Sequence, residues 1–77
     1  MMLLSELAAV TKGELRGTDA RFTSVGSDSR NIAKGQLFVA IKGDKFDGNT
    51  FAAQAVAQGA VGALVSDENV RDVPNVL

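Results

Sequence analysis

Ser27-Asp28-Ser29-Arg30 places two hydroxyls, a carboxylate and a guanidinium in four consecutive residues. These groups can hydrogen-bond a polar ligand, but Ser and Asp side chains also bond their own backbone in turns, which is the more frequent role of such a tetrapeptide. Arg30 could contact a ligand or form a structural pair with Asp28, and we favour the pair. The tetrapeptide is therefore a candidate site that needs support from the rest of the chain.

A second polar segment, Lys42–Asn49, is punctuated by glycine and contains one aromatic residue, Phe46. That ring could stack on a ligand ring, although anchoring the loop to the core is more common. Residues 30–45 hold four cations and one carboxylate, a local charge of +3 in a chain whose net charge is −1. Such a concentration of charge suits a phosphate-bearing ligand and equally suits a solvated surface. The cations are Arg30, Lys34, Lys42 and Lys45, and the carboxylate is Asp44.

Several kinds of chemistry are excluded by what the sequence lacks. Cysteine and histidine are absent, so thiol catalysis, cysteine zinc sites and the usual general base are excluded. No phosphate-binding glycine motif stands between a strand and a helix, and Asp44 and Asp47 are too few to hold Mg²⁺ by themselves. We assign no catalytic residue and no metal ligand. The small net charge and the lack of a long apolar run predict a cytoplasmic protein that binds neither nucleic acid nor membrane.

The elements that must position these residues follow from hydrophobic periodicity. Apolar residues at helical spacing predict a helix over 3–11, with Val10 in its apolar stripe and Gly13 at its end. A second helix over 50–58 is capped by Asn49 or Thr50 and stopped by Gly59. The expected strands are 14–16, 22–27, 37–41, 60–65 and one that begins at 75–77, of which 37–41 reads as covered on both faces.

This order predicts an α/β fold, a small single domain whose mixed sheet contains a right-handed βαβ unit and two main helices. Ligands of open α/β sheets bind beyond the carboxyl ends of the strands. Ser27–Arg30 and Lys42–Asn49 both follow strands, so we expect them to meet there. The second helix would add unpaired backbone N–H groups. Because residues 75–77 read as the start of a strand, we expect the chain to be a fragment of something longer.

The combined pattern resembles the Mur ligase family. The resemblance is carried by Asp28-Ser29-Arg30, the run from Gly35 to Gly43, Phe46-Asp47-Gly48, Phe51 and Gly59-Ala60, and it covers about residues 3–66. Two members share most of it, the ligase that adds D-alanyl-D-alanine and the ligase that adds the third residue of the peptidoglycan stem. Phe46 before Asp47-Gly48 favours the first, whereas Asn49 stands where the family often has histidine or arginine.

The resemblance implies that residues 1–77 form the N-terminal domain that binds the UDP end of a UDP-N-acetylmuramoyl-peptide. It implies ligand contacts from Ser27, Ser29, Asp44, Lys45 and Phe46, with Arg30, Lys42 and Asp47 as further possibilities. No cofactor is expected in this domain. The resemblance places ATP and Mg²⁺ in central and C-terminal domains of the same chain, which are the expected partners. The alternatives are the third-residue ligase and a non-catalytic interaction module with the same fold, because fold alone does not fix function.

Overall fold

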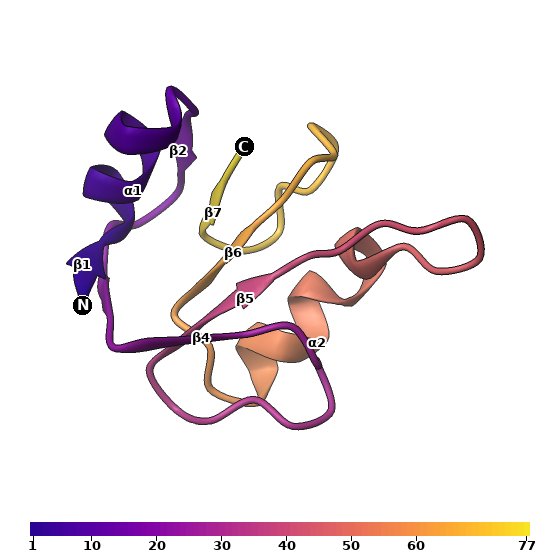
Figure 1. Cartoon of the computed structure of the whole chain (residues 1–77). Coiled ribbons are helices and arrows are strands. Elements are labelled where there is room, and N and C mark those ends of the chain that lie inside the picture. Colours follow the sequence, from indigo (N-terminus) through magenta and orange to yellow (C-terminus); the bar gives the residue numbers. More distant parts are fainter.

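A computed structural model describes all residues, 1–77, and centres on one mixed five-stranded sheet (Figure 1). Four of its strands are parallel, and the edge strand β2 runs antiparallel to β7. The predicted α/β fold with a mixed sheet is therefore confirmed. In spatial order the strands are β2 (Leu15–Arg16), β7 (Asn75–Val76), β6 (Gly62–Leu64), β5 (Gln36–Val39) and β4 (Ser24–Gly26).

The segment predicted as one strand over 22–27 is divided between two sheets, so that prediction was wrong. β3 (Arg21–Phe22) pairs with β1 (Met2–Leu3) in a small antiparallel sheet, whereas β4 pairs with β5. The chain bends at Thr23, whose N–H donates to the carbonyl of Gly35 at 3.0 Å. Phe22 is only 2% exposed, and its burial keeps Arg21–Phe22 beside β1. Ser24–Gly26 lie instead beside β5.

Each face of the main sheet carries its own apolar cluster, and β5 contributes to both. Leu37 packs with Leu4, Ala8, Phe22 and Val76, while the adjacent Phe38 packs with alanines of the second helix. Successive strand side chains point to opposite faces, so this division follows directly from the pleat. Figure 1 shows the two helices on opposite sides of the sheet. The prediction that this strand is covered on both faces is confirmed for Gln36–Val39, but Ile41 lies beyond the strand and is exposed.

The first helix, α1 (Leu4–Thr11), matches its predicted range closely. It ends at Lys12, which adopts the left-handed conformation directly before the predicted stop at Gly13. Val10, expected in the apolar stripe, is instead 73% exposed, because α1 faces the sheet through Leu4 and Ala8, its two buried residues.

The second predicted helix begins as a 3₁₀ turn, η1 (Gly48–Phe51), and continues as α2 (Ala52–Ala57). Neither Asn49 nor Thr50 caps it. The cap is Asp47, whose carboxylate accepts the Asn49 N–H at 3.0 Å. The expected stop at Gly59 is confirmed, since its φ of 126° is one that glycine adopts readily. Together with β5 and β6, this helix forms a βαβ unit with the predicted parallel pairing.

Candidate functional site

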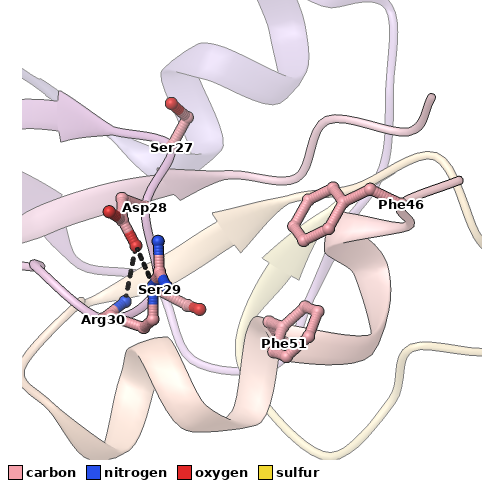
Figure 2. Close-up of a pocket in the computed structure, with 6 residues that line it drawn as sticks. All are labelled: Ser27, Asp28, Ser29, Arg30, Phe46 and Phe51. Atoms are coloured by element: carbon pink, nitrogen blue, oxygen red, sulfur yellow. Dashed lines mark hydrogen bonds and ion pairs between the residues drawn. The ribbon is translucent and has the colours of Figure 1, made fainter.

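An open cleft of about 550 Å³ lies beyond the carboxyl ends of β4 and β5. This is the edge at which open α/β sheets place their ligands. Figure 2 shows the turn after β4 on one side of the cleft and two phenylalanine rings on the other. The lining residues are Ser27, Asp28, Ser29, Arg30, Phe46 and Phe51.

The first wall is a turn organised by Asp28. Its Oδ1 accepts the backbone N–H of Arg30 at 2.9 Å and the Arg30 Nε–H at 3.3 Å. The backbone N–H of Arg30, and then its guanidinium, hold the pKa of Asp28 below its usual range, so this carboxyl is ionised at neutral pH. The predicted structural pair of Arg30 with Asp28 is confirmed. The Arg30 side chain is nevertheless 83% exposed, so its remaining N–H groups stay available at the cleft.

Ser29 lies deepest in this wall, with 7% of its surface exposed. Its hydroxyl makes no hydrogen bond within the chain, and no enclosed side-chain oxygen of the protein lacks a partner. The Ser29 oxygen is therefore open to solvent although the residue is buried. Ser27, at the start of the turn, is exposed and also lines the cleft. Two hydroxyls are thus available to a bound molecule.

The second wall is formed by Phe46 and Phe51, whose rings stack with centroids 5.4 Å apart and planes within 9°. Phe46 belongs to a short hairpin in which Gly43 N–H donates to the Phe46 carbonyl at 2.7 Å. Phe51 ends η1 and also packs on the α2-side cluster. A phenylalanine that is 51% exposed while stacked on a neighbour presents a flat apolar surface to the cleft.

Four of the predicted site residues do not line the cleft: Lys42, Asp44, Lys45 and Asp47. Asp44 and Lys45 lie in the exposed hairpin that extends away from the sheet after β5 (Figure 1). Lys42 and Asp47 form the antiparallel bridge at the base of that hairpin. Of the residues proposed as ligand contacts, the structure therefore brings together Ser27, Ser29, Arg30 and Phe46.

The cluster of positive charge predicted over residues 30–45 does not form one patch. Lys34 packs against Gly59 at the far end of α2, before β5 begins, whereas the cleft lies after that strand ends. Near the cleft, Arg30 is paired with Asp28. Hydrogen bonds from Asn49 lower the pKa of the Asp47 carboxyl, and the nearby charge of Lys42 lowers it further by a smaller amount. Neither Lys42 nor Lys45 forms a salt bridge, and Lys45 is the one of the two that lies at the exposed tip of the hairpin.

Sequence reasoning missed Phe51 as a residue of the cleft, and it included Asp28 in the candidate tetrapeptide without assigning it an individual ligand contact. Phe51 falls on the apolar stripe of the expected helix, so its position indicated a core role, which it partly has. The only available signal was that two aromatic residues flank Asp47-Gly48-Asn49-Thr50, a stretch able to turn the chain back on itself.

The arrangement suits binding of a flat, polar molecule more than catalysis. A stacked aromatic surface faces hydroxyls, a carboxylate and a guanidinium, the combination that holds a planar heterocycle with a polar extension. No group of three His, Cys, Asp or Glu side chains is placed to hold a metal ion. None of the helices is long and apolar enough to cross a membrane.

Comparison with known proteins gives consistent matches along the chain. A family profile described as "Mur ligase family, catalytic domain" matches residues 21–76. The UDP-N-acetylmuramoyl-tripeptide–D-alanyl-D-alanine ligase of Escherichia coli is 43% identical over 74 residues, which are 96% of this chain and 16% of that protein. The UDP-N-acetylmuramoyl-L-alanyl-D-glutamate–2,6-diaminopimelate ligase of Prochlorococcus marinus is 39% identical over 61 residues, covering 79% of this chain and 12% of that protein.

A crystal structure of MurF from Acinetobacter baumannii superposes with a TM-score of 0.78 at 27% identity, over 99% of this chain and 17% of that one. The chain thus spans about a sixth of the length of this structure and of the Escherichia coli relative.

Proposed function

Because the chain belongs to the Mur ligase family, we propose that its cleft binds the uridine-diphosphate end of a UDP-N-acetylmuramoyl-peptide. The observation that carries the proposal is the juxtaposition of the Phe46–Phe51 stack with the open hydroxyl of Ser29 across one cleft. The names of the relatives above share a UDP-N-acetylmuramoyl group. The cleft volume of about 550 Å³ falls in the range of small-molecule sites.

We assign the uracil ring to the aromatic wall. Base–aromatic stacking is worth about 1–3 kcal/mol per base and tolerates any base, so selectivity for uracil must come from hydrogen bonds. Ser27 and Ser29 can each donate and accept a hydrogen bond, which suits the carbonyls and the N–H of uracil or the ribose hydroxyls. The ionised Asp28 would accept from ribose hydroxyls and would repel a phosphate placed directly on it.

The pyrophosphate then belongs away from Asp28, toward cationic groups. The exposed guanidinium of Arg30 and the unpaired ammonium of Lys45 are the candidates. Backbone N–H groups near Asp44 could contribute, while Lys42 and Asp47 support the base of the hairpin. Lys45 lies outside the cleft itself, so this assignment requires the hairpin to move toward a bound ligand.

For the whole protein, we infer an ATP-dependent ligase of peptidoglycan precursor synthesis that adds D-alanyl-D-alanine to UDP-N-acetylmuramoyl-tripeptide in the cytoplasm. Parts of the protein outside these residues would bind ATP and Mg²⁺. The contribution of residues 1–77 would be positional, because a firmly held UDP group orients the distant reacting carboxylate. Diaminopimelate-adding ligases are also among the relatives, so the third-residue ligase is the second candidate.

The binding proposal is tested by adding UDP to the labelled chain and recording its amide correlation spectrum. We expect the amides of Ser27–Arg30 and Lys42–Phe51 to shift in a saturable way, and CDP and ADP to bind more weakly. Shifts confined to other parts of the chain would place the site elsewhere. Equal binding of all three nucleotides would remove the specificity that the proposal assigns to the serine hydroxyls.

A further inference from the structure

We propose that Asn49 is a positioning residue, whose buried side-chain amide fixes the aromatic wall of the cleft. This inference rests on the proposed nucleotide-binding function and adds a residue that does not line the cleft. Asn49 is 4% exposed and lies between the hairpin after β5 and the loop after β6.

Every hydrogen-bonding position of this amide is occupied. Its Nδ2 donates to Asp47 Oδ1 at 2.6 Å and to Ser66 Oγ at 3.1 Å. Its Oδ1 accepts the backbone N–H of Ser66 at 3.0 Å and of Asp67 at 3.2 Å. A primary amide offers two donors and one carbonyl with two lone pairs, so the site uses its full capacity. Asn49 therefore ties the base of the hairpin to the end of β6, a strand of the sheet core.

Both rings of the aromatic wall are attached to the backbone that this amide holds. Phe46 directly precedes Asp47, and Phe51 follows Asn49 by two residues within η1. Asp47 Oδ1 also accepts the Asn49 backbone N–H at 3.0 Å, which closes the turn between the two rings. The stacking distance of 5.4 Å thus depends on a turn whose anchor to the sheet is Asn49.

The opposite wall has its own support. The Ser27–Arg30 turn is held by Asp28 through bonds that do not involve Asn49. Loss of the Asn49 amide should therefore release one wall and leave the other in place. That selective change distinguishes positioning from a general loss of structure.

The test compares Asn49→Ala with Asn69→Ala, a matched control at an exposed asparagine whose side chain makes no hydrogen bond. Two quantities are measured on each variant of the chain. One is the set of nuclear Overhauser contacts between the Phe46 and Phe51 rings without ligand, and the other is the dissociation constant for UDP. We expect Asn49→Ala to lose the ring contacts and about tenfold in UDP affinity, near the loss of one base stack, while Asn69→Ala changes neither.

If Asn49→Ala fails to fold, Ser66→Ala replaces it, because it removes one bond to the amide at an exposed position outside the cleft. A weakened ring contact and an affinity loss of about threefold would then support the proposal. Retention of both the ring contacts and the affinity in whichever variant folds would overturn it. If the unmodified chain does not bind UDP, the proposed function fails, and the ring contacts alone decide the role of Asn49.

Discussion

Replacing Phe46 by alanine should separate ligand affinity from stability. The ring is 51% exposed and its main structural contact is the stack with Phe51. Such an aromatic pair contributes about 0.5–1.5 kcal/mol beyond area burial, and half of the ring is already in water. We therefore expect the free energy of unfolding to fall by about 1 kcal/mol.

The effect on UDP binding should be larger than the effect on folding. Truncating an aromatic residue beneath a nucleobase costs about 1–3 kcal/mol. Because Phe51 remains to form part of the wall, we expect the lower half of that range, or about a five- to thirtyfold rise in the dissociation constant. Phe46→Leu, which keeps apolar volume without a flat ring, should show an intermediate loss.

Isothermal titration with UDP and urea unfolding measure the two quantities on the same sample. The matched control is Ile41→Ala, since Ile41 is 55% exposed on the same loop and does not line the cleft. If Phe46→Ala binds UDP within about twofold of the unmodified chain, the base does not stack on this wall. An equal loss for Ile41→Ala would show that the loop, and not the ring, determines affinity.

Three further predictions concern the framework of the site. Gly48→Ala should destabilise the chain by about 2 kcal/mol in urea unfolding, because an added Cβ would lie 2.7 Å from the backbone nitrogen of Ile41. Asn75→Ala should cost about 2 kcal/mol in the same measurement, since Asn75 is fully buried and its removal leaves the Arg16 Nε–H and the Val73 carbonyl without the side-chain partner they have here. Hydrogen bonds from the Ser5 hydroxyl and N–H lower the pKa of Asp19 in the folded chain below the ordinary value of 3.8. The ionised Asp19 carboxylate therefore stabilises the fold at pH values above 3.8, and this stabilisation is lost as the pH falls through the lowered pKa of the folded chain. Asp19→Asn should therefore flatten the acid limb of the unfolding midpoint against pH.

Each of these three predictions has a control variant or a result that would contradict it. Gly43→Ala should be nearly silent, because the nearest atom to its added Cβ is 4.0 Å away, and a similar loss at both glycines would contradict the close-approach argument. For Asn75, the comparison is Asn31→Ala at an exposed position. For Asp19, an acid limb that is unchanged in the Asn variant would show that the hydrogen bonds to Ser5 do not stabilise the ionised form.

Much of the architecture could be predicted because it depends on local patterns. The helical spacing of Leu4, Leu7 and Ala8 indicated α1, and the apolar run after Gly35 indicated β5 together with its burial on both faces. The parallel βαβ unit followed from the order and length of its elements.

What could not be predicted depends on contacts between distant segments. The division at Thr23 requires partners at Met2–Leu3 and at Gly35, which no local pattern reveals. Two polar segments after strands were enough to indicate the edge of the sheet where the cleft lies, but not which residues line it. Phe51 ends a 3₁₀ turn that was predicted as regular helix, and Lys34 lies far from the cleft because it precedes β5.

We propose that a uracil ring lies between the Phe46–Phe51 stack and the Ser27–Arg30 turn. Intermolecular nuclear Overhauser contacts in the complex of the chain with UDP test this placement. We expect contacts from the uracil ring protons to the Phe46 ring and to the β-protons of Ser29. Contacts from uracil to other parts of the surface, with none to Phe46 or Ser29, would contradict it.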